Sequence, residues 1–267
     1  MESGNGKNRV LVTFNGMCLV AFSWKVHPEF PLLISANRDE FFDRPTAPLH
    51  TWESGLYAGK DLRGGGTWMG FHPNGKWALL TNYRDFSRPM TGEISRGRLV
   101  LDFLEKEISP ENYLDEVVSS KVRYEGFNLL LSDGDKLFYY SNYGDLPTEV
   151  KPGIHAISNA QLNAPWPKTE LAKQQLERLK PDGAKPEELL AILKSSQTYP
   201  LESLPTTGVG AEMEIQLSAQ LIRIAPNYGT VSATSVLRNK TGFTQLLERS
   251  YGWDPGDYRD ISFSFQT

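Results

Sequence analysis

Apolar runs of strand length lie at both ends of the chain and helical patterns fill the middle, and this order restricts the fold more than any other feature. The clearest signal is a hairpin in which Thr67 to Phe71 leads through the turn His72-Pro73-Asn74-Gly75 into a second apolar run that ends at Asn82. The Asn-Gly pair can adopt the positive φ angles that a tight turn between antiparallel strands requires. The sequence therefore predicts antiparallel sheet.

The remaining segments follow the order strands, helices, strands, helices, strands. Apolar residues recur at helical spacing between Ser95 and Glu107, and Ser109 followed by Pro110 is a strong start signal for a second helix that runs to about Val122. We expect strands at 19–24, 32–36, 128–131, 136–141, 219–224, 230–237 and 243–250, and further helices at 168–179 and 186–195. This order is typical of an α+β protein.

No Gly/Ser-rich linker, internal repeat or change of composition divides the chain. We therefore expect a single domain over residues 17–267, with a mobile tail after Trp253. In residues 1–16, the apolar stretch from Val10 to Phe14 is too short for the core of a signal peptide. We interpret residues 1–16 as an extension, which is an upstream start, an expression tag or a pro-segment.

Composition argues against several classes of function. The net charge of −4 is unfavourable for binding nucleic acid, and no run of about 20 apolar residues is available to span a bilayer. The one cysteine, Cys18, cannot form an intramolecular disulfide, which favours a reducing compartment such as the cytoplasm. The four histidines show no metal-ligand spacing. We expect a cytoplasmic protein without an integral membrane segment or metal, whose partner is a small-molecule substrate or ligand.

Cys18 directly follows an internal methionine, Met17. If the working chain starts at Met17 and that methionine is trimmed, Cys18 carries both a thiol and a free α-amino group. The α-amino group titrates near pH 8 in model peptides, so it can take the proton of the thiol and act as its base. The alternative is that a cysteine on an apolar strand is a small buried hydrophobic residue. Function therefore depends on whether residues 1–17 are present.

Two polar motifs follow. Asn37-Arg38-Asp39-Glu40 comes at the end of the predicted strand 32–36. It is either a solvated turn or a carboxylate carried beside the nucleophile strand, where it could hold an ammonium group. Gly64-Gly65-Gly66 lacks the Lys-Ser/Thr ending of a phosphate-binding loop, so it indicates close backbone packing beside a cleft.

These motifs occur in an order that resembles a known family. They are Met17-Cys18, Asn37 to Glu40, Gly65 to Gly70, Thr81 to Tyr83, Ile157 to Ala160 with Pro165-Trp166, Tyr228 to Thr230 and Glu248 to Ser250. The chain resembles the NRDE family, whose eukaryotic members are called transport and Golgi organization 2. That family is similar in its N-terminal organisation to the cysteine N-terminal-nucleophile (Ntn) hydrolases. The resemblance implies a four-layer αββα sandwich, with two antiparallel sheets face to face and helices outside.

The resemblance also implies roles for individual residues. Cys18 would be the nucleophile, Asp39 would accept hydrogen bonds from its amino group, and Asn82 would donate to the oxyanion. Asn159 would be a second oxyanion or substrate-facing asparagine. Alternatively, both asparagines close strands as turn residues, and Asp39 pairs with an arginine. The residues predicted to bind substrate are Asn37, Arg38, Trp68, Tyr83 and Arg238.

Two positions depart from the related hydrolases. Ala36 stands where bile salt hydrolases carry an arginine, and Val231 stands where many family members have an arginine after Tyr-Gly-Thr. Arg38 is near the first position, but its side chain would point to the opposite face from that of Asp39. A cationic group for a carboxylate-bearing substrate would then be missing or would come from Arg223 or Arg238.

Two functions compete. One is an Ntn-type cysteine hydrolase that acts on a linear amide or related acyl bond and needs no cofactor. The other is a non-catalytic carrier of haem or of lipid and acyl-CoA, because the family is associated with haem trafficking and lipid homeostasis. In that case haem would be a carried ligand.

Overall fold

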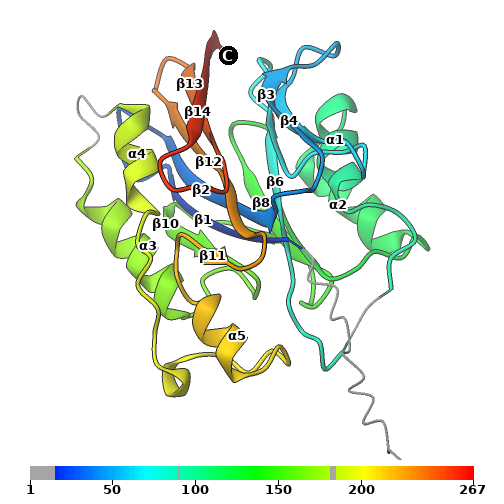
Figure 1. The fold of residues 1–267 in the computed structure, drawn as a ribbon. Coiled ribbons are helices and arrows are strands. Elements are labelled where there is room, and N and C mark those ends of the chain that lie inside the picture. Colours follow the sequence, from blue (N-terminus) through cyan, green and yellow to red (C-terminus); the bar gives the residue numbers. More distant parts are fainter. Residues whose placement is uncertain (1–15, 89–90, 181–184) are drawn as a thin grey trace, which may run out of the picture.

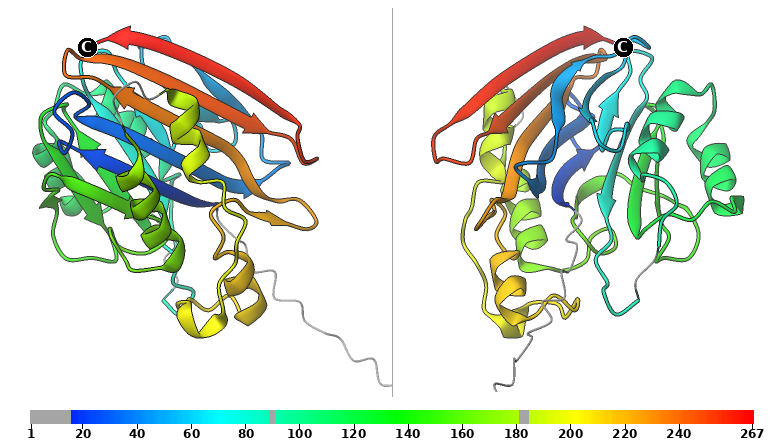
Figure 2. Two further views of the ribbon diagram at one scale, coloured as in Figure 1. Left: turned by 90° about the vertical axis from the view of Figure 1, so that its left-hand side faces the viewer. Right: turned by 45° about the vertical axis from the view of Figure 1, so that its right-hand side comes forward.

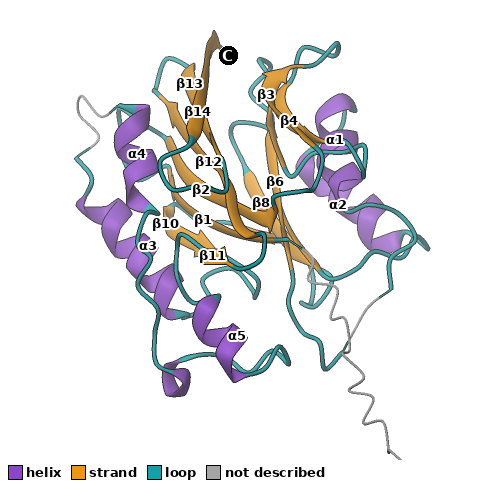
Figure 3. Ribbon diagram, viewed as in Figure 1, coloured by secondary structure: helices purple, strands orange, loops and turns teal. Residues whose placement is uncertain are grey.

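The computed structural model describes residues 16–88, 91–180 and 185–267 (Figure 1). Within these ranges the chain forms two seven-stranded antiparallel sheets with α-helices outside them (Figure 3). The predicted extension, residues 1–16, lies outside the described residues except for Gly16. The α+β class expected from the order of the segments is confirmed.

The first sheet has β1 and β2 near its centre. Its order is β10-β1-β2-β12-β13-β14, and the short β11 pairs with β12. The bounds are β1 (Met17–Trp24), β2 (Leu32–Phe41), β10 (Gly153–Ile157), β11 (Arg223–Ile224), β12 (Tyr228–Arg238), β13 (Phe243–Tyr251) and β14 (Tyr258–Gln266). All eight residues of β1 are buried, because β1 has strands on both edges and packed layers on both faces.

The second sheet is a meander in which each strand pairs with the next one along the chain. Its order is β3-β4-β5-β6-β7-β8-β9. The bounds are β3 (Thr46–Thr51), β4 (Tyr57–Asp61), β5 (Met69–Phe71), β6 (Trp77–Asn82), β7 (Phe127–Ser132), β8 (Leu137–Ser141) and β9 (Thr148–Glu149). Antiparallel neighbours can be joined by short hairpin connections, but the connection from β6 to β7 is long and contains both helices that cover this sheet.

The main core lies between the two sheets. Side chains alternate along a strand, so the even-numbered residues of β1, such as Phe22 and Trp24, face the other sheet, where they join Trp77 of β6. The odd-numbered residues Leu19 and Ala21 face the opposite way and join a second cluster beneath the helices. One apolar strand therefore contributes to two layers of the core.

Helices cover the outer face of each sheet (Figure 2). α3 (Pro167–Arg178) and α4 (Pro186–Ile192) pack on the first sheet, and α1 (Gly97–Glu105) and α2 (Pro110–Ser119) pack on the second. A 3-10 turn (Leu201–Ser203) and α5 (Ala211–Gln216) lie beyond the lower end of the first sheet in Figure 1. The order helix, sheet, sheet, helix confirms the αββα sandwich implied by the resemblance.

The strongest local signals were right. β5 and β6 form the predicted hairpin, and its Gly75 has a φ of +98°, where glycine is favoured because it has no Cβ. The backbone N–H of Gly75 donates to the carbonyl of His72 at 3.0 Å and closes the turn. α2 begins at Pro110, and Ser109 Oγ accepts the backbone N–H of Asn112 at 3.2 Å, as expected for an N-cap.

The solvated-turn interpretation of Asn37 to Glu40 is wrong. These residues lie inside β2 and are buried, because β2 pairs with β1 on one side and, as far as Phe41, with β12 on the other. The mobile tail expected after Trp253 is also wrong. β14 pairs with β13 along nine residues, and Phe265 stacks on Tyr57 with ring centres 4.8 Å apart. Asn37 to Glu40 are held by strands from both ends of the chain, whereas β14 forms a hairpin with β13 and is also held by the distant Tyr57.

The glycine run 64–66 packs closely against the start of α1, as expected. A Cβ added to Gly66 would lie 2.5 Å from the carbonyl carbon of Gly97 and 2.6 Å from its oxygen. Both atoms belong to the backbone, so neither can move aside like a flexible side chain. The close packing brings α1 against the segment that leads into β5.

Replacing Gly66 by Ala should therefore force the two segments apart. We expect the free energy of unfolding to fall by about 1–3 kcal/mol, the usual cost of overpacking, measured by urea denaturation. Gly144→Ala is the matched control, since its nearest non-neighbouring atom is the Ser141 carbonyl oxygen at 3.4 Å. Equal stability of the two variants would contradict this account.

Candidate active site

Cys18 is the second residue of β1, and its thiol faces the space between the sheets. It lies directly opposite Arg38 of β2, so both side chains point to the same face. Cys18 is only 6% exposed, and burial raises the pKa of its thiol to about 12. The thiol is therefore protonated at neutral pH in this form of the chain.

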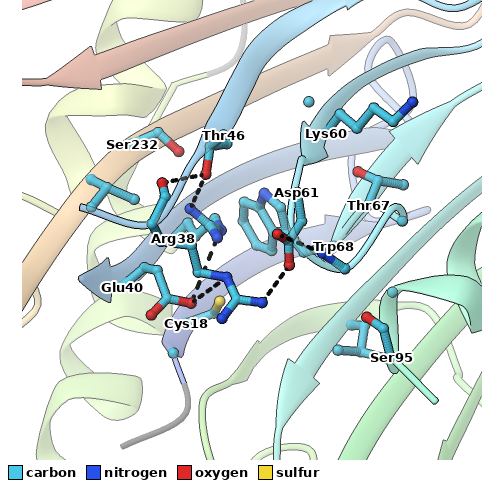
Figure 4. A pocket seen from close by; sticks show the side chains of 18 of the residues that line it. Cys18, Arg38, Glu40, Thr46, Lys60, Asp61, Thr67, Trp68, Ser95 and Ser232 are labelled. Atoms are coloured by element: carbon cyan, nitrogen blue, oxygen red, sulfur yellow. Dashed lines mark hydrogen bonds and ion pairs between the residues drawn. The ribbon is translucent and has the colours of Figure 1, made fainter. Parts of the chain in front are cut away.

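Cys18 lines a pocket of about 580 Å³ (Figure 4). A chain of ion pairs runs through the lining. Glu40 Oε2 lies 3.6 Å from Arg38 Nη2 and 3.7 Å from Arg44 Nε, and Arg44 Nη2 lies 2.7 Å from Asp61 Oδ2. Because these alternating charges surround the thiol, the pocket suits a polar ligand.

Asp39 follows Arg38 in β2, and its side chain points toward the helices. It lies opposite Met17 of β1 and Thr230 of β12. Its Oδ1 accepts a 2.6 Å hydrogen bond from Thr230 Oγ1, whereas Oδ2 has no hydrogen-bond partner among the described residues. Burial raises the pKa of the carboxyl group, and the charge of Lys168 opposes that rise. One buried oxygen is thus available to a further donor.

Lys168, in the first turn of α3, supplies a counter-charge for Asp39. It is 2% exposed, and its Nζ donates to the carbonyl of Leu217 at 3.0 Å. Burial lowers the pKa of its ammonium group, Arg84 lowers it further, and Asp39 raises it. Arg84 is itself buried and forms a 2.9 Å ion pair with Glu214. The helix-facing side of the site therefore holds two buried cations and two buried carboxylates.

The two predicted asparagines meet at the end of β6. The side-chain amide of Asn82 donates to the carbonyl of Gly16, just before β1. Asn159 donates from Nδ2 to the backbone carbonyl of Asn82 at 2.9 Å, and the adjacent Ser158 hydroxyl donates to the carbonyl of Cys18 at 2.9 Å. Asn82 lines the pocket, whereas Asn159 is fully buried behind it. Asn159 thus lies where it supports the end of β6.

Gly16 and Met17 occupy the space directly before Cys18. The backbone N–H of Met17 donates to Tyr228 Oη at 3.1 Å, and Met17 Sδ accepts from Arg84 Nη1 at 3.2 Å. With Met17 attached, the nitrogen of Cys18 is a peptide amide, whose lone pair is delocalised into the carbonyl. This form of the chain therefore has the thiol but lacks the α-amino base.

Arg38 and Trp68 both line the pocket, as expected for substrate-binding residues. Ala36 and Arg38 are two residues apart on one strand, so they share the face that carries Cys18. Arg38 therefore provides a cation on the face of β2 that lines the pocket. Whether either residue touches a substrate stays a prediction.

The other three residues predicted to bind substrate do not line the pocket. Asn37 faces the helices, where its Nδ2 donates to the carbonyl of Leu193 at 2.9 Å. Tyr83 stacks on Tyr143 with ring centres 4.3 Å apart. Arg238 ends β12, and it donates to the carbonyl of Gly75 in the β5–β6 turn. These contacts connect layers and turns of the fold.

The sequence motifs assigned no role to Thr230 or Lys168. Thr230 donates a hydrogen bond to Asp39, and Lys168 supplies a positive charge that lowers the pKa of Asp39. A signal was present, because Thr230 closes the Tyr228-Gly229-Thr230 motif and Lys168 follows Pro165-Trp166. What the motifs could not reveal is that these residues meet Asp39.

Across residues 16–88, 91–180 and 185–267, no group of three or more His, Cys, Asp or Glu side chains is arranged to hold a metal ion. In the same ranges no helix is long and apolar enough to cross a membrane.

Fold and site together define a class of protein. It is an αββα sandwich with a cysteine at the start of an inner strand and a buried carboxylate on the neighbouring strand, the arrangement expected of an Ntn-hydrolase-like protein. The chain belongs to the family described as Transport and Golgi organisation 2, whose profile matches residues 17–252.

Individual relatives agree with this family. The chain is 32% identical over 280 residues to the Transport and Golgi organization protein 2 homolog of Bos taurus, covering 94% of this chain and 99% of the bovine protein. It is 34% identical over 260 residues to the Homo sapiens homolog, covering 88% and 93%. Among solved structures, a Caenorhabditis elegans N-acylethanolamine-hydrolyzing acid amidase ortholog aligns over 82% of this chain and 92% of its own, with a TM-score of 0.47 and 12% identity.

The raised thiol pKa predicts slow alkylation of Cys18 while Met17 is attached. At about pH 8 we expect iodoacetamide to react roughly 10³-fold more slowly than with an ordinary thiol, because only the thiolate reacts. Mass spectrometry measures this rate directly, since Cys18 is the only cysteine of the chain. The same protein unfolded in guanidinium chloride is the control, and a folded rate within tenfold of the control would contradict the buried, protonated thiol.

Lys168→Met should make stability more dependent on pH. The folded-state pKa of Asp39 is raised to about 6, so its contribution to stability is complete at low pH and is lost as the pH rises through that value. Removing the nearby cation raises this pKa further. Burial lowers the pKa of Lys168, so holding its charged form in the fold costs most at low pH. Removal of Lys168 is therefore also better tolerated at low pH. We expect a loss of about 3–5 kcal/mol at about pH 8 and a smaller loss at about pH 5.

Urea denaturation at the two pH values measures this difference. Lys173→Met, on the partly exposed side of the same helix where Lys173 pairs with Glu170, is the matched control. We expect it to change stability by less than about 1 kcal/mol at either pH. Equal losses for Lys168→Met at both pH values would show that Lys168 does not act on Asp39.

Proposed function

We propose that the chain, when it begins at Cys18, is an Ntn-type cysteine hydrolase that acts on a linear amide or related acyl bond. The observation that carries this proposal is the state of Asp39. Its Oδ2 is buried without a hydrogen-bond partner among the described residues, on the strand next to Cys18. An unsatisfied buried carboxylate oxygen is costly, and a free ammonium or amino group on Cys18 is the donor that would satisfy it.

The reaction follows from the two groups of Cys18. The α-amino group takes the proton of the thiol, and the thiolate attacks the carbonyl carbon of the substrate to give a tetrahedral oxyanion. Collapse breaks the C–N bond, and the leaving amine takes the proton from the ammonium group. A thioester on Cys18 remains. Water then gives a proton to the amino group, attacks the thioester and releases the acid, which restores the thiol.

Asn82 is our proposed donor to the oxyanion. In the chain that retains Gly16, its amide group already donates to a carbonyl oxygen at the entrance of β1. Departure of Gly16 would leave that N–H available to a substrate oxygen in the same pocket. A pre-positioned donor of this type contributes about 3–4 kcal/mol to the transition state of acyl transfer.

The chain that retains Met17 would then be a latent form. Its Cys18 nitrogen cannot act as a base, and the thiol, with a pKa of about 12, supplies almost no thiolate at neutral pH. When Met17 leaves, the peptide nitrogen of Cys18 becomes an amino group. That amino group is a base, and it lies next to the thiol whose proton it can take.

A non-catalytic carrier of haem or of lipid and acyl-CoA is the second candidate. The pocket of about 580 Å³ includes Trp68, and it is present although Cys18 has no base. Saturable binding of haem or a fatty acyl-CoA that survives Cys18→Ala would favour the carrier, and no binding would weaken it. For either function we expect a small-molecule partner and, from the single cysteine, a cytoplasmic location.

Protein that starts at Cys18 should form a covalent acyl adduct with activated acyl esters, seen by intact-mass spectrometry. We expect Asp39→Asn to slow adduct formation by about 10²–10⁴-fold, because the amide cannot stabilise and orient the amino group as the carboxylate does. Asp135→Asn, at an exposed ion pair with Lys25, is the control and should leave the rate unchanged. Absence of any adduct on Cys18 in a correctly trimmed, folded protein would refute the proposed hydrolase.

A further inference from the structure

Met17 fills a closed compartment on the helix-facing side of β1. Its side chain is 2% exposed, and it packs in a cluster separate from the main core. The buried members of that cluster are Leu217, Ala219, Ile222, Ile224 and Tyr228. Most of this wall comes from the segment between α5 and β12, so it does not depend on Met17 for its own backbone.

The compartment has one polar wall that Met17 only partly satisfies. Arg84 Nη1 donates to the thioether sulfur at 3.2 Å, but sulfur is a weak acceptor. Arg84 is 6% exposed, and its Nε has no hydrogen-bond partner among the described residues. Its guanidinium lies 5.1 Å from the ring centre of Trp166 and is fixed by Glu214. A rigid, buried donor thus points at the far end of the Met17 side chain.

A small void lies next to this wall. Its volume is about 10 Å³, and its lining includes Arg84, Trp166, Lys168 and Leu217. That is room for about one water molecule. Loss of Met17 would add the volume of a whole methionine side chain to this space, in a protein whose interior is otherwise closely packed.

The compartment also lies within reach of the nucleophile. The carbonyl of Met17 is bonded to the nitrogen of Cys18, so attack by Sγ on that carbon would close a five-membered ring. A substrate carbonyl at the place vacated by Met17 is therefore within reach of the thiolate. Gly16, which precedes Met17, lines the large pocket, so its departure would open the start of β1 toward that pocket.

We infer that the Met17 compartment becomes the acyl-group subsite once Met17 has been removed. It takes a short, unbranched acyl chain that carries a neutral hydrogen-bond acceptor near its far end, as the methionine side chain does. Because Glu214 already neutralises Arg84, a second carboxylate there would be repelled. This inference rests on the proposed hydrolase, and it names the class of substrate.

Four anilides that differ only in the acyl group test the subsite with protein starting at Cys18. They are des-amino methionyl, its all-carbon isostere hexanoyl, glutaryl and acetyl. We expect kcat/KM for des-amino methionyl to exceed that for acetyl and for glutaryl at least tenfold, since one methylene in a fitted pocket changes kcat/KM about 10–200-fold. The kcat/KM for the hexanoyl anilide should lie between that for des-amino methionyl and those for acetyl and glutaryl. Similar values for all four acyl groups would overturn the subsite.

A variant tests the compartment without relying on turnover. Ala219→Leu adds bulk to its wall, so it should lower Tm clearly in the chain that retains Met17 and little or not at all in the chain that starts at Cys18. In the trimmed chain it should also abolish the preference for des-amino methionyl. Equal losses of Tm in both chains would overturn the compartment, even if no anilide is cleaved. Complete absence of acylation with the Tm difference intact would refute the hydrolase and leave a ligand cavity.

Discussion

The antiparallel pairing of β1 with β2 controls the chemistry of this protein. Because successive side chains alternate between the faces of a sheet, the register that places Cys18 opposite Arg38 also places Met17 opposite Asp39. Thiol and guanidinium face the pocket between the sheets, while the carboxylate and the methionine face the helices. A slip by one residue would exchange the two faces and separate every group of the site. The apolar residues that follow in β1 oppose this slip, because it would move the large Phe22 and Trp24 beneath the helices and the small Ala21 between the sheets.

Burial of charge is the second constraint. Asp39, Lys168, Arg84 and Glu214 are all nearly inaccessible to water. Isolated charges in such places cost several kcal/mol each, and this cluster is tolerable because cations and carboxylates alternate. The remaining deficit lies at Asp39 Oδ2 and Arg84 Nε. Asp39 lies opposite Met17 in the register and Arg84 Nη1 contacts its sulfur, which is why we connect Met17 with a ligand.

Met17 connects the proposed hydrolase with the proposed acyl-group subsite. It turns the nitrogen of Cys18 into an amide, and its side chain fills the compartment that we assign to an acyl group. The same residue removes the base and blocks the subsite, so one cleavage would supply both. The carrier alternative makes no such demand, because the large pocket is present with Met17 in place.

By itself the sequence determined many of the local elements and the candidate nucleophile. It did not predict β3, β4, β10 or α5, and of the expected strand 219–224 only Arg223–Ile224 is strand. Alternating and helical patterns, the Asn-Gly turn and the Ser-Pro helix start act over a few residues, so they could be read correctly from the chain. The sandwich followed only from the family resemblance. Tertiary structure decided that Asn37 to Glu40 is buried strand rather than turn, that β14 is ordered, and that Thr230 and Lys168 meet Asp39. Apart from the hairpin of β13 and β14, those outcomes depend on contacts between segments far apart along the chain. Local patterns do not specify which distant strand or helix lies next to them.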